Sequence, residues 1–193
     1  FAIIYAKNKT KAQVGDNARI YAKSLEVNAE KKAVNATWTN KDVEINGTIN
    51  ASGTVTINAE NQITSNAFKA AAGSAGVIGL GAAVAYMDVT GTTKVLIGST
   101  GSLNGKSGVH VSARLIINAN PTADGYAGGW ASAGMAAARL KVTGTTIVEV
   151  LSGSSLASIN GNVKLNANQN ITSTATTTAA GQAEADAFEG EGE

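Results

Sequence analysis

The chain has 193 residues, a formal net charge of +1, no cysteine and a single histidine, His110. A charge this close to zero gives no field strong enough to recruit nucleic acid or anionic lipid, so neither is expected as a partner. The absence of Cys and the lone His exclude disulfides and the usual zinc sites, and we expect no metal and no cofactor.

Short alternating segments appear from the start of the chain. Residues 19–22 and 25–29 place an apolar side chain at every second position, as a strand with one buried face does. The segments VNAT, VEIN and TINA within residues 34–51 have the same character and are separated by polar turns. Hydrophobic residues make up 44% of the chain and aromatics only 5%, which favours a long, narrow core of small and β-branched side chains.

One 14-residue stretch occurs three times at a fixed distance, in residues 53–66, 107–120 and 161–174. Val55, Val109 and Val163 begin its alternating pattern and are each 54 residues apart (109 − 55 and 163 − 109). Recurrence at a long period indicates a solenoid, in which each unit stacks on its neighbours. A related segment at residues 25–30 precedes the first copy by only 30 residues. We interpret the 54-residue unit as two coils, with one coil of about 24 residues (54 − 30) missing from the first copy.

A Gly/Ala-rich tract lies between the copies. Residues 70–87 carry no charge and are long enough to suggest a membrane span. The matching tract at 123–146 contains Asp124 and Arg139, so we do not expect membrane insertion. The glycines of residues 76–85 imitate a dinucleotide-binding fingerprint, but Val84 replaces its third glycine, and packing in a solenoid wall explains them better.

These patterns predict an all-β fold, a right-handed parallel β-helix of ~7–8 coils that forms a rod roughly 35–40 Å long. We expect a single solenoid domain over residues 1–180, built of two-coil repeats, and an acidic tail or the start of a further repeat at 181–193. Two coils per repeat would place Asp88 and Lys141 ~10 Å apart, too far for a direct ion pair. The absence of an initiating Met and of a signal-like segment is expected of a fragment or a processed chain.

The succession AVAYMDVTGTTKVLIGSTGSL (83–103) followed by VHVSA (109–113) resembles repeats of large secreted bacterial adhesins. These are leukotoxin-family filamentous adhesins, filamentous-haemagglutinin-like proteins and autotransporter passengers. The resemblance covers about residues 1–180. It implies a non-catalytic segment at the bacterial cell surface or outside the cell, which acts as a rigid stalk or attachment surface. Its implied partner is a host-cell or matrix receptor or a glycan.

Two further readings remain open. A β-helix can also carry a carbohydrate-active enzyme or a carbohydrate-binding surface, but the acids are scattered along the chain, so we do not expect catalysis. A binding patch would draw first on Trp130 and Tyr126, which interrupt a tract of small residues, and on Trp38, because aromatics are favoured in recognition surfaces. The alternative for Trp130 and Tyr126 is a ring lying over a glycine-lined wall. Exposed coil ends are unpaired strand edges, which favours end-to-end self-association.

Overall fold

The computed structural model describes residues 7–34, 38–65, 68–129 and 131–180, and every element within these ranges is a β-strand. The strands of the first two turns are β1 (Lys7–Val14), β2 (Arg19–Ala22), β3 (Leu25–Val34), β4 (Trp38–Ile45), β5 (Thr48–Ala51), β6 (Thr54–Ser65) and β7 (Lys69–Ala75). The later strands are β8 (Ile78–Ile97), β9 (Ser102–Gly105), β10 (Gly108–Ala119), β11 (Thr122–Gly128), β12 (Ala131–Val150), β13 (Ser155–Ser158), β14 (Val163–Ser173) and β15 (Thr176–Ala180).

The strands form four parallel sheets that the chain visits in rotation. Sheet A has the order β1-β4-β8-β12, sheet B β2-β5-β9-β13, sheet C β3-β6-β10-β14 and sheet D β7-β11-β15. All neighbouring strands are parallel. The chain passes from A through B and C to D and then begins the next turn, so the predicted parallel β-helix is confirmed.

The 54-residue repeat is one turn of the helix. Val109 pairs directly with Val55 on one side and with Val163 on the other, so equivalent residues lie in adjacent turns. The described strands therefore make four turns, and the prediction of two coils per repeat and ~7–8 coils was wrong. The physical reason is the length of the walls. The 20-residue strand β8 runs along one wall opposite both β10 and β11, whereas we had assumed coils built of short strands only.

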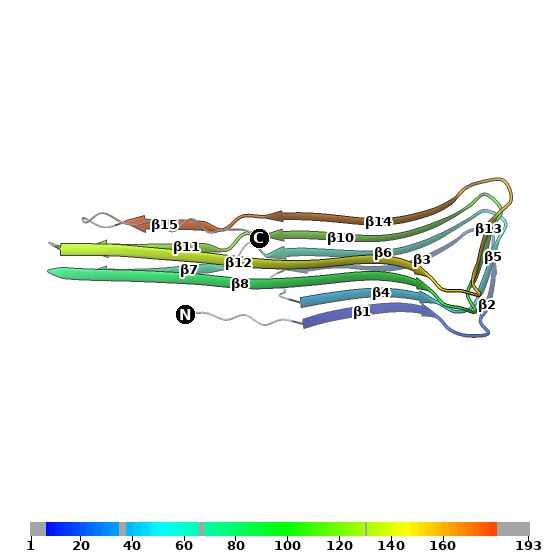
Figure 1. Ribbon diagram of the computed structural model, residues 1–193, viewed down its shortest axis with the longest axis horizontal. Helices are drawn as coiled ribbons and strands as arrows, with labels where there is room; N and C mark the ends of the chain where they lie inside the picture. Colours follow the sequence, from blue (N-terminus) through cyan, green and yellow to red (C-terminus); the bar gives the residue numbers. More distant parts are fainter. Residues whose placement is uncertain (1–6, 35–37, 66–67, 130, 181–193) are drawn as a thin grey trace.

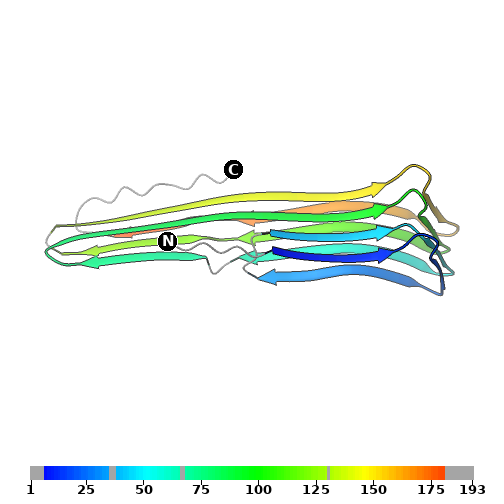
Figure 2. The ribbon, with the colours of Figure 1, turned by 90° about the horizontal axis from the view of Figure 1, so that it is seen from below.

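The overall shape follows from this long turn. Four parallel strands stacked at about 4.8 Å give a stack only ~15 Å high between its first and last strands. Figure 1 shows that the longest dimension lies along the strands. The expectation of a rod elongated along the stack was therefore wrong. Sheet A forms one wall and sheets C and D form the other, while the short strands of sheet B close one end (Figure 2).

The first turn is shorter than the later turns. Lys7 pairs with Trp38, an offset of 31 residues (38 − 7), and Leu25 pairs with Val55, an offset of 30 (55 − 25). Among the described residues the first turn contributes no strand to sheet D, and β1 and β4 begin opposite the middle of β8 (Figure 1). The short first copy is thus a narrower turn, not a pair of coils with one missing.

The interior holds two apolar clusters with a polar layer between them. One cluster lies next to sheet B and includes Ile45 and Ile57, and the other lies toward sheet D and includes Met87 and Ile117. The layer between them consists of fully buried Thr39, Lys41, Asn61 and Thr93. Asn61 Nδ2 donates a hydrogen bond to Thr39 Oγ1 at 2.8 Å, and Lys41 Nζ donates one to Thr10 Oγ1 at 2.8 Å. These bonds offset part of the cost of burying polar groups.

The walls approach each other closely at the end remote from sheet B. We call this region the thin end: sheet D together with Ile78–Val89 of β8 and Ala131–Val142 of β12. A Cβ on Gly79 would lie 2.6 Å from the carbonyl oxygen of Gly128, and one on Gly81 would overlap the carbonyl oxygen of Tyr126. The Gly/Ala tracts therefore supply the small side chains that let two sheet backbones come into contact.

Candidate functional site

A groove crosses the outer face of sheet B. The strands of this sheet are only four residues long, and their apolar positions, such as Ile49 and Leu103, point into the core. The alternate positions point outward and align across the strands in two rows. The rows are Arg19–Thr48–Ser102–Ser155 and Tyr21–Asn50–Asn104–Ala157.

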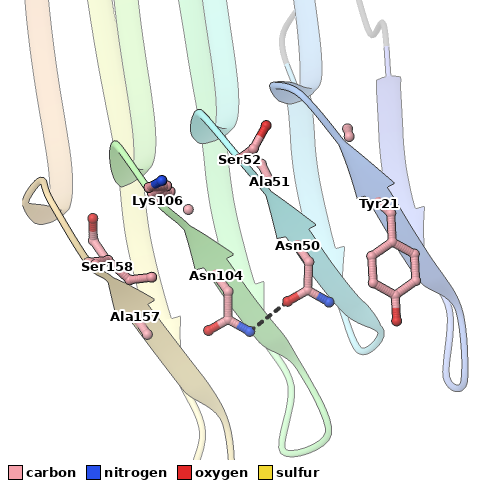
Figure 3. Close-up of a pocket in the computed structure, with 11 residues that line it drawn as sticks. Tyr21, Asn50, Ala51, Ser52, Asn104, Lys106, Ala157 and Ser158 are labelled. Carbon is pink, nitrogen blue, oxygen red and sulfur yellow. Dashed lines mark hydrogen bonds between the residues drawn. The ribbon is translucent and has the colours of Figure 1, made fainter.

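The groove has a volume of about 550 Å³ and follows the second of these rows. Figure 3 shows Tyr21, Asn50, Asn104 and Ala157 on the four neighbouring strands of sheet B. Ser52 and Lys106 directly follow β5 and β9, and Ser158 is the last residue of β13. Tyr21 lies at one end and is 73% exposed, and Ile159 lies at the other and is 80% exposed. The groove thus runs along the stack, across the strands, and presents an exposed ring at one end.

An amide pair forms the middle of the groove. Asn104 Nδ2 donates to Asn50 Oδ1 at 2.9 Å and to Ser102 Oγ at 3.3 Å (Figure 3 shows the first bond). Each Asn side chain has two donor hydrogens and one acceptor oxygen. The bonds within the described residues leave Asn50 Nδ2 as a donor and Asn104 Oδ1 as an acceptor. The pair can therefore offer a ligand one donor, on the side of Tyr21, and one acceptor, on the side of Ala157 (Figure 3).

The electrostatics of the groove are simple. Lys106 is the one charged side chain among the described lining residues, and that lining contains neither a carboxylate nor a histidine. The backbone N–H of Lys106 donates to the carbonyl oxygen of Ala51 at 3.0 Å, which fixes the start of its loop against the preceding turn. The groove can hold a polar or anionic ligand, but its described residues offer no acid–base pair for hydrolysis.

Trp38 and Tyr126, the two predicted binding candidates within the described residues, lie on different sheets. Trp38 lies on the outer face of sheet A, partly buried, with the Lys7 Nζ atom 5.9 Å from its ring centroid. Tyr126 lies on the outer face of sheet D, 48% exposed, and its register partner in β7 is Gly73. Trp130 lies outside the described residues. Tyr126 therefore has a glycine as its register partner in β7, and Trp38 is on another wall.

The surroundings of Tyr126 contain one ion pair. Lys69 Nζ lies 2.7 Å from Asp124 Oδ2 and joins β7 to β11. This hydrogen-bonded contact lowers the pKa of Asp124 and raises the pKa of Lys69 relative to their ordinary values. Each charge is neutralised by its neighbour, which leaves no unbalanced charge in the pair to attract a ligand toward Tyr126.

Sequence reasoning missed Tyr21, Asn50, Asn104 and Lys106. The signal was present in the short segments RIYA, TINA, SLNG and SLAS, which occupy the same place in each turn. Aligning their third residues gives the row from Tyr21 to Ala157. Their solvent-facing positions carry no apolar pattern, so a search based on hydrophobic periodicity passes over them.

The described residues contain no group of three or more side chains suited to holding a metal ion. They also include no helix that is long and apolar enough to cross a membrane. The fold and groove define the chain as a parallel β-solenoid with a lateral groove. Comparison with protein-family models, curated proteins and solved structures gives no match.

Proposed function

We propose that this chain is a non-catalytic segment of a bacterial surface adhesin, in which it serves as a rigid support and attachment surface. The observation that carries the proposal is the continuous parallel stacking of the turns. Residues 54 apart pair directly from β6 through β10 to β14, and every sheet continues the same stack. Such stacking makes each turn a template for the next and yields a stiff body with large lateral faces.

The outer surface supports an attachment role because its side chains bridge the turns. Asn58 Nδ2 donates to Asn28 Oδ1 at 3.3 Å, and Ser112 Oγ donates to Asn58 Oδ1 at 2.7 Å. Ion pairs add further links between neighbouring strands, such as Lys94 with Glu149 at 2.6 Å. Side chains held in this way lose little further freedom when a ligand binds, which favours recognition by a preformed surface.

A carbohydrate-binding role within the same surface is the second candidate. The composition of the groove favours it over carbohydrate cleavage, because glycoside hydrolysis ordinarily uses two carboxyl groups across the scissile bond. The described lining supplies none.

Antibody labelling of intact cells tests the proposal. Antibodies raised against the purified chain should label intact cells of the source bacterium, and brief protease treatment of those cells should remove the signal. A cytoplasmic protein labelled in parallel should be detected only after permeabilisation. Labelling of our chain that likewise required permeabilisation would contradict a surface role.

A further inference from the structure

We propose that the groove on sheet B binds a linear, non-sulphated polysaccharide that carries uronic acid residues, of the kind found in extracellular matrix. This inference deepens the attachment function proposed above and rests on it. Three features of the groove identify the ligand: its direction relative to the strands, the chemistry of its side chains, and its single charge.

The direction of the groove suits an extended glycan chain. Parallel strands lie about 4.8 Å apart, which is close to the length of one pyranose unit in an extended polysaccharide. Successive sugars laid along the groove would each meet one rung of the row Tyr21–Asn50–Asn104–Ala157. The lining spans all four strands of the sheet, so the groove suits an internal stretch of a chain better than a single terminal sugar.

The side chains match the two kinds of surface that a pyranose presents. The exposed ring of Tyr21 offers a flat apolar face for the C–H side of a sugar. Asn50 Nδ2 and Asn104 Oδ1 remain as a donor and an acceptor at the two outer ends of the bonded pair, where hydroxyl groups of two different sugars along the chain can meet them (Figure 3). Ala157, the next rung beyond Asn104, has a small side chain that leaves room for a sugar ring to lie against it.

The single charged side chain of the groove favours this ligand over more highly charged polymers. One lysine, Lys106, can pair with one carboxylate, whereas nucleic acids and densely sulphated chains are held by several cations. A peptide that adds a strand would pair with the backbone at an open edge of the sheet, β2 or β13, whereas the groove lies across the outer face of all four strands. A weakly charged, hydroxyl-rich chain is the polymer that satisfies both conditions.

Titration of the full chain by two-dimensional ¹H–¹⁵N NMR tests the proposal. The probe is a hyaluronan hexasaccharide, with cellohexaose as the neutral comparison and a heparin hexasaccharide as the densely charged one. We expect the hyaluronan probe to shift the amide signals of the sheet B strands and of the loop at Lys106. Cellohexaose should shift the same signals at higher concentration, because it lacks the carboxylate.

Matched variants locate the contact. Tyr21→Ala should weaken hyaluronan binding about tenfold, and Tyr21→Phe should retain it, because stacking requires the ring and not the hydroxyl. Lys106→Ala should remove the preference over cellohexaose and most of the salt dependence. The controls are Tyr86→Ala and Lys164→Ala, which alter exposed residues on sheets A and C. Both should bind like the original chain. Unchanged circular dichroism and amide spectra verify that each variant is folded.

Three results would overturn the inference: no shifts at millimolar hyaluronan hexasaccharide, shifts centred on Trp38 or Tyr126, or tightest binding to heparin with shifts spread over all lysines. Each of these leaves the labelling of intact cells unaffected, so a failed groove can be told from a failed surface role. Conversely, binding in the groove by a protein that labels only permeabilised cells would retain the site and reject the adhesin.

Discussion

Charged side chains form ion pairs that link neighbouring turns of the solenoid. Ion pairs among the described residues join neighbouring strands of sheets A, C and D, as in Lys11–Glu44 and Arg114–Glu60. Lys141 Nζ lies 3.7 Å from Asp88 Oδ2, so the expectation that these two groups are too far apart to pair was wrong. Its cause was the assumption of two coils per repeat, which doubled the separation between register partners.

Glu44 provides a test of this role. Its Oε2 atom lies 2.5 Å from Lys11 Nζ, and its Oε1 accepts a hydrogen bond from Asn46 Nδ2 at 2.8 Å. These contacts, with the one to Lys11 larger, lower the pKa of Glu44 below its ordinary value of 4.5. Because the pKa is lower in the folded state, the stabilisation is present above the unfolded pKa and is lost as pH falls through the folded pKa.

We expect Glu44→Gln to lower the free energy of unfolding at pH 7 by about 0.5 kcal/mol, a small value because the pair is partly exposed to solvent. The difference between the two proteins should shrink as the pH falls below 4.5 and vanish once Glu44 is protonated in the folded protein. Urea unfolding at a series of pH values measures it. A difference that did not depend on pH would assign the effect to packing and not to charge.

Individual residues also show what the sequence could and could not predict. The inward positions Val55 and Val109 were predictable because both are fully buried and burial demands an apolar residue there. The buried Asn61 was not, since its register partner one turn later is Leu115 and the pattern alone indicates a plain apolar row. Its partner Thr39 comes from the opposite wall, 22 residues earlier, and no local pattern reveals that contact. The row that lines the groove was hidden because outward positions tolerate any polar side chain.

Among the strands, glycine sets the distance between the walls. A Cβ on Gly91 would lie 2.8 Å from Leu115 Cδ1, and one on Gly144 would lie 2.7 Å from Gln169 Nε2. In both cases a large side chain on one wall faces a glycine on the other. At the thin end the partner is the backbone itself, at Gly81 and Gly125. The two long strands β8 and β12 thus carry glycine where the opposite wall comes closest.

Substitution of a glycine at the thin end tests whether the two walls leave room for a larger side chain. Gly81→Ala places a methyl group against the backbone of Tyr126, which cannot move aside as a flexible side chain would. We expect a loss of about 1–3 kcal/mol in the free energy of unfolding. Thermal unfolding followed by circular dichroism measures it, and the transition should fall by several degrees.

Gly73→Ala is the matched control. Gly73 belongs to β7 and has no atom within 4 Å of an added Cβ, so Ala there should be neutral or slightly stabilising. Equal losses at the two positions would mean that glycine serves backbone conformation throughout and that the walls are not in close contact.

The long strands were also the element that the sequence concealed. Alternation identified the inward face of Gly53–Asn66, but in residues 70–87 the side chains on both faces are small or apolar. The outward Ile78, Leu80 and Val84 are exposed, and the inward Gly79 and Gly81 are buried. Hydrophobic periodicity therefore does not identify the buried face where burial depends on side-chain size instead of polarity. For this reason the sequence did not show that residues 78–87 and 88–97 form one continuous strand, β8.

For the molecule as a whole, the two ends of the stack differ. The outermost strand at one end, β1, directs Lys7, Lys9 and Lys11 outward, and lysines along an edge strand oppose pairing with another chain. At the other end Val163, Leu165 and Ile171 are 38–53% exposed in β14. We therefore propose end-to-end association through the β12–β15 end of the stack and not through the β1 end.

Deleting one complete turn tests the repeat directly. Removal of Thr56–Val109 (109 − 56 + 1 = 54) joins Val55 to His110, so that an inward residue is again followed by an outward one. Because turns contact only their neighbours, we expect a soluble three-turn protein that unfolds cooperatively with a smaller free energy. Circular dichroism, gel filtration and urea unfolding measure this.

The control deletion is one residue shorter. Removal of Thr56–Gly108 (108 − 56 + 1 = 53) joins two inward valines in succession and turns the apolar side chains that follow toward solvent. We expect this protein to aggregate. The start of the deletion also matters. Register partners are 54 residues apart between β6 and β10 but 53 apart between β8 and β12, as in Ile78 and Ala131, so a 54-residue deletion within β8 and β12 would shift the register by one residue. Equal behaviour of the two deletions would show that stacking does not depend on register.

The stacking direction has a mechanical consequence for the proposed attachment role. Hydrogen bonds between parallel strands point from turn to turn, so tension applied to the first and last turns pulls along those bonds. The outermost turn is held from one side only and should detach first, followed by the next. Detachment of a 54-residue turn would release roughly 180 Å of extended chain, and detachment of the shorter first turn would release less. Such a segment would lengthen in discrete steps under load and so limit the force that reaches its attachment point.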